Sequence, residues 1–556
     1  MPNPQVASRA IVTCGQNEAH NRACWKNRWD INTDYENITP DTGNTRTFDL
    51  RITNVTEFAL DGVLRRAMLI NNQYPGPAIT ADWGDMLHIT VHNELTDNGT
   101  SIHWHGMRQL HTNNQDGANG VTECPIPPGE SRTYSFRATQ YGTSWYHSHF
   151  STQYGNGVVG PLVINGPASA DYDLDLGPYV VSDTYHFTSD VGMLMAEMAN
   201  KAPPKSDNIL FNGQNINTAG EGGSYNKMTL IKGKKHRLRI INTSVENHFT
   251  LSLVGHNFTV IATDMVPVRP VVKSQIFVAV GQRYDVIIDA SQEVGNYWFN
   301  ATLSKDGLCG ASKNLFPAAI FSYSGADDDV LPTDQGTPVT ADCHDTTGFV
   351  PVVSRTASLE DWQDNNKELD INLTTVVTGR GRVFQWQVNS SAMDVTWERP
   401  ILSYIREGNT SYPTAGNAIS LDKANVWTYW VIANIVGLPH PIHLHGHDFL
   451  VLGTADKGHF DPAADMDKLN FKNPVRRDVA MLPGGWLVIA FKTDNPGAWL
   501  MHCHIAWHVS QGLSVQFLER TSEIATANDL SQLQPNCDSW KTYHAKAFYP
   551  KLDSGL

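Results

Sequence analysis

Apolar and polar residues alternate in short runs along most of this chain. Three of these runs are residues 134–149 (YSFRATQYGTSWYHSH), 284–302 (YDVIIDASQEVGNYWFNAT) and 487–504 (LVIAFKTDNPGAWLMHCH). Successive side chains of a β-strand point to opposite faces, so this period predicts β-strands. Turn residues separate the runs, and the chain has 43 glycines and 29 prolines. We therefore predict an all-β protein.

The same three runs are copies of one pattern. Each has an alternating strand, a turn, a glycine (Gly142, Gly295 or Gly497) and an aromatic-rich lead-in. A three-residue terminus begins five positions after that glycine and reads HSH, NAT and HCH in turn. Self-similarity of this kind indicates that one structural unit is used three times.

A second set of three segments precedes the first. The segments read IHWHG at residues 102–106, LSLVG at 251–255 and IHLHG at 442–446. When their last glycines are aligned, the outer copies have an HxH pair where the middle copy has Ser252 and Val254. The middle copy therefore lacks the histidines that the outer copies share.

The repeats divide the chain into three predicted domains, which we expect to be Greek-key β-sandwiches or barrels. The predicted boundaries place them at residues 1–168, 169–353 and 354–556. A chain of 556 residues is long enough for three domains of ordinary size.

The charge balance argues against two classes of partner. The formal net charge is −15 and no basic stripe is present, whereas proteins that bind nucleic acids or anionic membranes use clustered Lys and Arg to do so. No run of the sequence approaches the roughly eighteen apolar residues that a membrane helix needs. We expect neither nucleic acid nor a membrane as a partner.

The segment LMHCHIAWHVSQGL, residues 500–513, carries the most specific chemistry. On a strand His502 and His504 project to one side and Cys503 to the other, so one tripeptide can touch two sites. His508 can return towards the thiolate, and a second imidazole would complete a His₂Cys trigonal set, which suits copper. A buried free thiol is the ordinary interpretation of a lone cysteine. Zinc also accepts Cys and His, but a zinc site would leave His502 and His504 with nothing to bind.

Four HxH pairs occur, two in each outer domain. A single pair is weak evidence for a metal, but eight imidazoles facing one another would make a poor core unless they bind cations. His440 stands three residues before His443 and can supply the second imidazole for Cys503. The pairs are His103/His105, His147/His149, His443/His445 and His502/His504.

Cysteines and glycosylation sequons indicate an oxidising compartment. Setting Cys503 aside leaves six cysteines, for which 15 pairings are possible. Cys14 with Cys24, and Cys309 with Cys343, are close enough in sequence to pair, and Cys124 with Cys537 would then join the first part of the chain to the last. We expect a secreted, extracellular glycoprotein. The nine sequons begin at Asn37, Asn54, Asn98, Asn242, Asn257, Asn300, Asn372, Asn389 and Asn409.

The N-terminal residues 1–5 lack the apolar core of a signal peptide. Because the cysteines and sequons point to secretion, we expect a leader to have been removed or replaced.

Four stretches, HWHG, WYHSH, HPIHLHGHDF and HCHIAWHVSQGL, resemble the copper-binding stretches of the multicopper oxidases. Nearly the whole chain shares the resemblance, because the three-domain arrangement is also that of the family. Within the family the sequence is similar to the laccases, particularly those of ascomycete fungi. The resemblance implies three cupredoxin domains and four copper ions, one of type 1, one of type 2 and two of type 3.

The resemblance also implies a role for each histidine of the pattern. Electrons would enter at the type 1 copper, pass Cys503 and reach the other three coppers through His502 or His504, where O₂ is reduced to water. The implied ligands are His440, Cys503 and His508 for type 1, His103 and His443 for type 2, and His105, His147, His149, His445, His502 and His504 for type 3.

Three further residues gain a role from the resemblance. Leu513 occupies the axial position of the type 1 copper, where the absence of a Met ligand should make a stronger oxidant. Asp116, in QDG, resembles the acidic residue that supplies protons near the type 2 copper, although an Asp before Gly is often a turn former. Glu246 resembles the residue that takes the phenolic proton, although a surface glutamate without a function fits equally well. The C-terminal DSGL resembles a tail that plugs the channel to the trinuclear site, which draws attention to Leu556.

The function we expect is that of a laccase, which oxidises phenols and aromatic amines by one electron and reduces O₂ to water. Small aromatic substrates and O₂ would be the partners, and we expect a monomer. Another multicopper oxidase, such as a ferroxidase, an ascorbate oxidase or a bilirubin oxidase, remains an alternative. A non-catalytic copper-binding glycoprotein is a second alternative, but a carrier needs one site and has no use for eight paired histidines.

Overall fold

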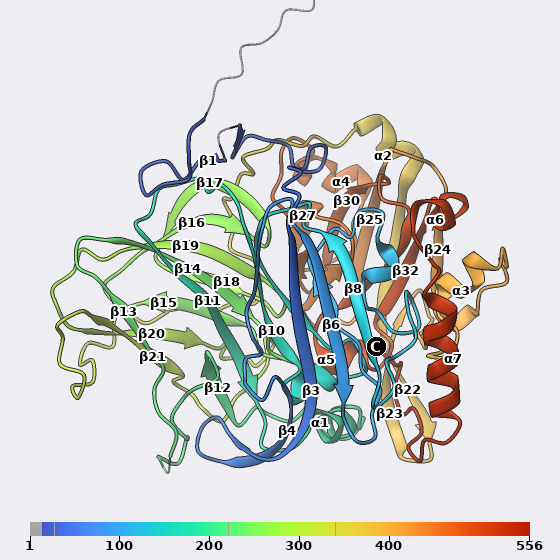
Figure 1. Ribbon diagram of the computed structural model, residues 1–556, viewed down its shortest axis with the longest axis horizontal. Coiled ribbons are helices and arrows are strands. Elements are labelled where there is room, and N and C mark those ends of the chain that lie inside the picture. The colour runs from blue at the N-terminus through green and yellow to red at the C-terminus, as the bar shows by residue number, and fades with distance from the viewer. Residues whose placement is uncertain (1–13, 27, 221, 340) are drawn as a thin grey trace, which may run out of the picture.

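The computed structural model describes residues 14–26, 28–220, 222–339 and 341–556, and the inference about a leader falls on residues outside these ranges. Strands dominate the described chain and form pairs of stacked sheets (Figure 1). The all-β prediction is therefore confirmed. A small two-stranded sheet, β1 (Cys24–Trp25) with β2 (Trp29–Asp30), precedes the larger sheets.

The first module comprises the strands between residues 45 and 165, in two four-stranded sheets. One sheet has the order β4 (Leu64–Ile70), β3 (Thr45–Ala59), β6 (Met86–Glu94) and β8 (Ser131–Arg137), and the other has the order β5 (Ile79–Asp82), β10 (Val159–Asn165), β9 (Gly142–His147) and β7 (His103–His105).

The middle module comprises the strands between residues 174 and 323, in a six-stranded and a five-stranded sheet. The larger sheet has the order β12 (Asn208–Phe211), β11 (Leu174–Thr184), β14 (Lys235–Asn242), β19 (Arg283–Asp289), β16 (Phe258–Thr263) and β17 (Val266–Lys273), and the smaller has the order β13 (Lys227–Leu230), β21 (Ala318–Tyr323), β20 (Asn296–Thr302), β15 (Phe249–Leu253) and β18 (Ile276–Val278).

The last module comprises the strands between residues 366 and 519, again in a six-stranded and a five-stranded sheet. The larger sheet has the order β23 (Gly381–Val388), β22 (Asn366–Thr378), β25 (Trp427–Asn434), β30 (Trp486–Lys492), β27 (Phe449–Ala455) and β28 (Arg476–Arg477), and the smaller has the order β24 (Ala418–Leu421), β32 (Ser514–Glu519), β31 (Gly497–Cys503), β26 (His440–Leu444) and β29 (Val479–Leu482).

Short helices lie at the ends and edges of these sheets. The α-helices are α1 (Ser189–Ala196), α2 (Leu359–Asn365), α3 (Ile401–Arg406), α4 (Pro462–Asp465), α5 (Ala506–Val509), α6 (Thr521–Ala527) and α7 (Leu533–His544), and the 3₁₀ helices are η1 (Asn113–Gln115), η2 (Gln153–Asn156), η3 (Thr414–Gly416) and η4 (Met466–Lys468).

Alternation explains why these segments pair as strands. In β6 the apolar residues Leu87, Ile89 and Val91 are fully buried, while His88, between them, is exposed. One face of this strand therefore packs in the core of the first module and the other meets solvent. The strand β31 is buried along its whole length, because it lies in the interior of its sheet with both faces covered.

The threefold repeat predicted from the sequence is visible in the strand order. The sheets that contain β9, β20 and β31 have the same relative order of strands in the first, middle and last modules. His103 pairs with His147, Ser252 with Asn300, and His443 with His502, so the two aligned motifs sit on neighbouring strands in each copy. The predicted domain boundaries at residues 168 and 353 fall between strands of successive modules and stay a prediction.

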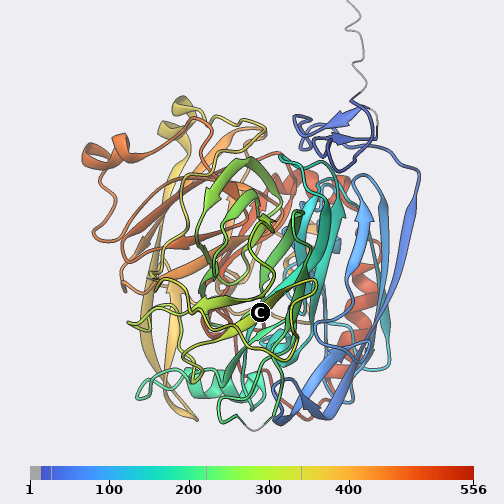
Figure 2. The ribbon, with the colours of Figure 1, turned by 90° about the vertical axis from the view of Figure 1, so that its left-hand side faces the viewer.

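The three modules surround a common centre. In Figure 1 the middle module lies to the left and the last module to the right and behind, with the first module in front between them. Figure 2 shows the middle module facing the viewer, with the last and first modules on either side. Each module therefore touches the other two.

Three disulfides join the cysteine pairs that the sequence predicted. They join Cys14 to Cys24, Cys124 to Cys537 and Cys309 to Cys343, as expected. The second spans 413 residues and ties the first module to α7 of the last. Among the described residues Cys503 is the free cysteine, and it is buried.

Candidate metal centres

Cys503 lies at the end of β31 with two histidines beside its sulfur. His440 comes from the neighbouring strand β26, and His508 comes from α5, the turn of helix that follows β31. The Cys503 Sγ lies 3.6 Å from Nδ1 of His440 and 3.5 Å from Nδ1 of His508, and the two nitrogens are 3.1 Å apart. We call these three residues the Cys503 site. Their ligand atoms form one group of metal-binding size.

The donors of the Cys503 site suit copper. Burial lowers the pKa of His440 to about 3 and that of His508 well below its usual value, so both imidazoles are neutral donors. Burial raises the pKa of the Cys503 thiol, which would therefore keep its proton unless a cation replaced it. Two neutral imidazoles around one sulfur match the trigonal donor set of a blue copper site.

The Cys503 site is buried except at one edge. Cys503 and His440 are fully buried, whereas His508 is partly exposed. Trp386 was not foreseen from the sequence, and its ring lies 4.4 Å from the His508 ring and 4.8 Å from the His440 ring. Contact with a molecule from solvent is therefore possible at His508.

Leu513 adjoins the Cys503 site. Its carbonyl oxygen accepts a hydrogen bond of 3.1 Å from the Cys503 N–H, and its side chain is buried beside Cys503. An aliphatic side chain brings no ligand atom to a metal. The axial role that the resemblance implies for Leu513 stays a prediction.

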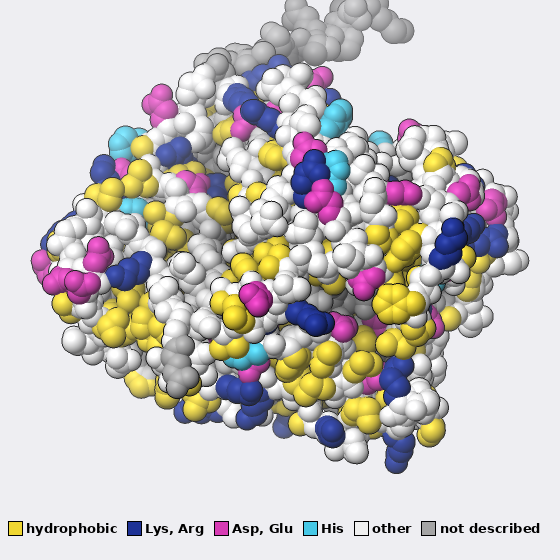
Figure 3. Space-filling model, turned by 60° about the horizontal axis from the view of Figure 1, so that its bottom comes forward, with side chains coloured by type: hydrophobic (Ala, Val, Ile, Leu, Met, Phe, Trp, Pro, Cys, Tyr) yellow, Lys and Arg dark blue, Asp and Glu magenta, His cyan; other side chains and the backbone are white. Residues whose placement is uncertain are grey.

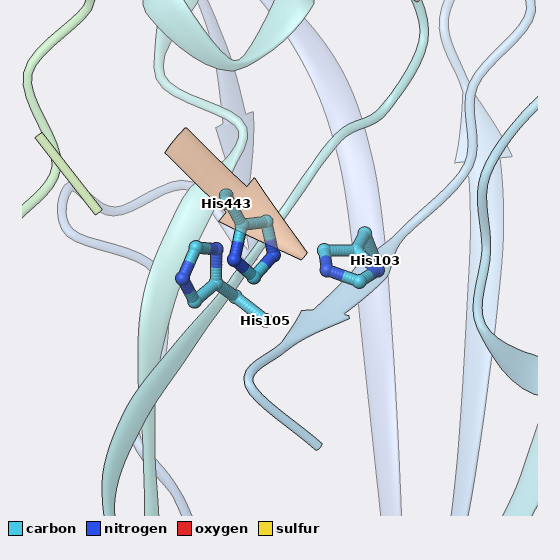
Figure 4. Close-up of side chains that lie close together, drawn as sticks. All are labelled: His103, His105 and His443. Carbon is cyan, nitrogen blue, oxygen red and sulfur yellow. The ribbon is translucent and has the colours of Figure 1, made fainter. Parts of the chain in front are cut away.

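The eight histidines of the HxH pairs gather in one place, the histidine cluster. They come from the adjacent strands β7 and β9 of the first module and β26 and β31 of the last, or directly follow these strands. The His103 and His445 rings stack 3.8 Å apart, as do the His105 and His443 rings. Figure 4 shows His103 and His105 from β7 meeting His443 from β26.

The ligand nitrogens of the cluster fall into groups of three, each spanning less than 4.8 Å. Each group draws on both outer modules, so neither module alone could build a three-histidine site. The groups are His105, His147 and His504; His149, His445 and His502; and His103, His105 and His443.

Buried nitrogens without partners show that the cluster fits metal ions. None of the eight histidines is more than 4% exposed. Burial together with neighbouring imidazoles lowers the pKa of His147, His149 and His504 well below the usual value, so these rings are neutral. A buried ring nitrogen without a partner is costly, and a metal ion would satisfy it. Such atoms are Nε2 of His103, His147, His149 and His443 and Nδ1 of His149 and His504.

Asp116 contacts histidines of the cluster from both outer modules. His103 Nδ1 donates to the Asp116 carbonyl oxygen at 2.8 Å, and His445 Nδ1 donates to Oδ2 of its carboxylate at 2.8 Å. Asp116 is fully buried, and it also follows η1 and precedes Gly117, whose φ of +82° forms a turn. It therefore combines a turn position with contacts to the cluster. Its role in proton supply stays a prediction.

Glu246 is bound at the rim of the Cys503 site. Its Oε2 accepts hydrogen bonds from the Tyr185 hydroxyl at 3.1 Å and from the Trp507 indole N–H at 3.3 Å. Trp507 directly precedes His508, so Glu246 lies near the exposed edge of the site. Burial and the charge of Asp183 raise the pKa of Glu246 to about 7. Proton transfer by this partly buried carboxyl stays a prediction.

Asp478 is a neighbour of the cluster that no sequence motif indicated. It accepts a hydrogen bond from His105 Nε2 at 3.0 Å, and Arg283 of the middle module donates two hydrogen bonds to its carboxylate. Burial raises the pKa of Asp478, but Arg283 and His443 outweigh burial and hold it below its usual value. The run RRD at residues 476–478 was the available signal, because three charged residues precede a buried strand.

The C-terminal segment reaches the cluster. Leu556 is 1% exposed and lines a small cavity together with His147, His149, His502 and His504. The Ser554 hydroxyl donates to the Val509 carbonyl oxygen at 2.8 Å and helps to fix the segment. That this tail closes a channel stays a prediction.

In the described part of the chain, no helix combines the length and apolar character that crossing a bilayer requires.

Comparison with known proteins agrees with this geometry. Models of the multicopper oxidase family match residues 51–169, 177–326 and 387–523. The chain is 53% identical to a laccase from Neurospora crassa, over 98% of this chain and 89% of the relative. It is 52% identical to laccase-1 from Melanocarpus albomyces over the same shares. The crystal structure of a laccase from Botrytis aclada has a TM-score of 0.89 and 40% identity, covering 97% of this chain and 99% of that one. This chain, with its clustered histidines and its Cys503 site, belongs to the multicopper oxidase family.

Proposed function

We propose that the protein is a laccase. It oxidises four molecules of a phenol or aromatic amine by one electron each and reduces one O₂ to two waters. The observation that carries this proposal is the arrangement of β31, in which Cys503 belongs to one site while His502 and His504, joined to it by peptide bonds, belong to the other. The similarity to fungal laccases over nearly the whole chain supports it.

We propose that the protein holds four copper ions. His440, Cys503 and His508 would hold type 1, and His103 and His443 would hold type 2. His105, His147 and His504 would hold one type 3 copper and His149, His445 and His502 the other, as the groups of ligand atoms suggest. When bound, copper supplies the one-electron acceptor at the Cys503 site and the centre of O₂ reduction at the cluster.

The protein separates the place of oxidation from the place of O₂ reduction. A substrate can approach the partly exposed His508, while the histidines of the cluster are closed off from solvent. The route between the two is the backbone and side chains of residues 502–504. No larger aromatic molecule therefore needs to enter the cluster.

The surroundings of His508 favour apolar aromatic substrates. The helix α1 packs against α5, which carries His508, and Val191 and Met195 on α1 are 41% and 43% exposed. Figure 3 shows hydrophobic side chains on the face of the molecule that includes α1. Aromatic rings would gain free energy by burying this surface.

Glu246 would take the proton that a phenol loses on oxidation. Its pKa of about 7 means that the carboxylate, which is the proton-accepting form, becomes the main form as the pH rises through neutrality. Asp116 would pass protons towards the cluster, since it contacts His103 and His445. The four phenolic protons balance those that two waters require.

A ferroxidase is the closest alternative. Binding of Fe(II) would require several free carboxylates beside His508, because hard divalent cations prefer oxygen ligands. Glu246 is bound to Tyr185 and Trp507, and the neighbouring Asp183 accepts the backbone N–H groups of Val245, Glu246 and Asn247. These contacts favour a proton acceptor over an iron site.

Oxygen uptake by the copper-loaded protein tests the proposal. With a methoxyphenol as electron donor we expect uptake of one O₂ per four molecules oxidised, and a much lower rate with Fe(II). Absorption and paramagnetic-resonance spectra should report type 1, type 2 and type 3 copper together. A protein that holds four coppers and consumes no O₂ with either donor would be a copper-binding glycoprotein. We further propose that the protein is secreted, which the disulfides support, and that it is a monomer.

A further inference from the structure

The middle module lies against the histidine cluster although none of its described residues belongs to a group of metal-binding size. Gly281, in the turn between β18 and β19, has a φ of +85°. A Cβ atom added there would lie 3.2 Å from Cε1 of His105 and 3.1 Å from Cδ2 of His504. The backbone of the middle module is therefore in contact with cluster rings from both outer modules.

Arg283 extends this contact two residues further along the chain. It is completely buried, and its Nη1 and Nη2 donate to Oδ1 and Oδ2 of Asp478 at 2.7 and 2.6 Å. Nη1 also donates to the Gly281 carbonyl oxygen at 3.0 Å, and Nε donates to the Thr143 carbonyl oxygen at 3.2 Å. One guanidinium of the middle module thus holds groups from the first and the last modules in fixed positions.

Asp478, held by Arg283, in turn accepts hydrogen bonds from two histidines of the cluster. Its Oδ1 accepts from His105 Nε2 at 3.0 Å, and its backbone oxygen accepts from His443 Nδ1 at 2.9 Å. The His105 and His443 rings are stacked, with an angle of 10° between their planes, and Figure 4 shows them next to each other. Gly106 lies against the same ion pair, since a Cβ there would meet Arg283 Nη2 at 2.5 Å and Asp478 Oδ2 at 2.7 Å. A side chain at position 106 would therefore collide with the ion pair.

The contact with Asp478 sets His105 apart from the other cluster histidines. Five other histidines of the cluster use Nδ1 to hydrogen-bond a group that is not a cluster imidazole, and this leaves their Nε2 for a metal. In His105 the partnered nitrogen is Nε2, and Nδ1 faces His504 Nε2 at 3.3 Å. The histidines with a partnered Nδ1 are His103, His147, His443, His445 and His502.

We propose that Arg283 and Asp478 form a positioning pair through which the middle module sets the geometry of the cluster. Asp478 accepts the N–H at Nε2 of His105 and so leaves Nδ1 free to bind metal, while Arg283 fixes the carboxylate in place. The inference rests on the proposed assignment of His105 to type 3 and His443 to type 2 copper. In this arrangement the middle module supplies no metal ligand, but it determines which nitrogen of His105 faces the metal.

A purely structural ion pair is the alternative. Asp264 of the middle module also binds this region, since it accepts the N–H groups of Asp478 and Val479 and pairs with Arg477. If the pair were purely structural, breaking it would lower the stability of the protein and leave the copper sites of the folded protein unchanged. A positioning pair would alter the cluster of a protein that is still folded.

The variants Arg283→Met and Arg283→Lys of the full chain, loaded with copper, distinguish the two. For R283M we expect a changed type 2 paramagnetic-resonance spectrum, less than four coppers per chain and a kcat roughly 10- to 100-fold lower. The type 1 absorption and the KM for a phenol should stay the same, because the Cys503 site does not contact Arg283. R283K keeps the charge and loses the paired geometry, so its spectrum and kcat should lie between those of R283M and the unchanged protein.

Arg237→Met is the matched control. Arg237 is a buried arginine of β14 in the same sheet, and its guanidinium hydrogen-bonds Asp285 and Tyr172 and no histidine of the cluster. R237M should lose thermal stability and keep the type 2 spectrum. The inference fails if R283M and R283K keep the unchanged spectrum and kcat, or if R237M alters the spectrum equally. If R283M does not fold, R283K alone decides. Absence of a type 2 signal and of O₂ uptake in the unchanged protein would instead overturn the proposed function, and the inference with it.

Discussion

The Cys503 site and the histidine cluster share β31, yet they differ in construction. The three residues of the Cys503 site all come from the last module, and one of them, His508, is partly exposed. The cluster draws eight histidines from two modules, and all of them are buried. A site that takes electrons from molecules of many shapes needs an accessible edge. A site that reacts with O₂ needs enclosure, and an enclosure between modules provides it.

Replacing the residue that joins the two regions should have the largest effect. In Cys503→Ser the thiolate ligand is lost, and we expect the oxidation rate of a phenol to fall roughly 1,000-fold or more. The blue absorption should disappear, while the type 2 signal of the cluster remains. Met501→Leu, two residues earlier on the same face of β31, should leave both signals in place. Retention of blue colour in the serine variant would show that Cys503 is not the ligand.

Asp116→Asn tests the cluster by itself. The amide keeps the shape of the side chain but can no longer bind His445 as a carboxylate, so we expect kcat to fall roughly 10- to 100-fold. The type 1 absorption should be unchanged and the type 2 spectrum shifted. Asp85→Asn is the matched control, because Asp85 is a buried carboxylate of the first module paired with Arg46. Equal loss of kcat in both variants would point to general destabilisation.

Glu246→Gln tests the accessible edge. We expect kcat/KM for a phenol to fall roughly 10- to 100-fold. In the unchanged protein Glu246 has a pKa of about 7, so its contribution grows as the pH rises through 7, and this rise should be absent from the variant. Ferrocyanide releases no proton when oxidised, so its rate should be the same in both proteins. A slower reaction with ferrocyanide would mean that Glu246 acts on the copper site and not on the substrate proton.

Leu513→Met should have the smallest effect and should be confined to the Cys503 site. A thioether in the axial position would stabilise the oxidised copper, so the potential of the type 1 copper should fall and phenol oxidation should slow a few-fold. Redox titration of the blue band measures the change, and Leu513→Ile serves as the isosteric control. A potential that does not move would remove Leu513 from the axial position.

Much of the fold followed from local patterns. The alternating run before Gly142 predicted a strand, which is β8, and the aligned glycines revealed that the same unit occurs three times. The histidines that gather in the cluster could also be named in advance, because strand geometry puts both members of an HxH pair on one face. Short separations along the chain indicated two of the disulfides, and elimination gave the third.

Contacts between modules could not be foreseen in the same way. Arg283 and Asp478 are separated by 195 residues, and a single buried ion pair leaves no periodic trace in a sequence. The partners of Glu246 were equally hidden, since Tyr185 and Trp507 belong to different modules and meet only when these pack together. The sequence indicated the candidate ligands, and packing determined which residues surround them.

The division of the cluster between the first and last modules has a consequence for biosynthesis. His103 and His105 are made early, whereas their partner His443 follows more than three hundred residues later and His502 and His504 later still, so a fragment that ends before the last module has no complete three-histidine set. The histidines of the first module therefore lack a third partner from the cluster until the strands of the last module have been made. Cofactor insertion at the cluster therefore depends on synthesis of the last module.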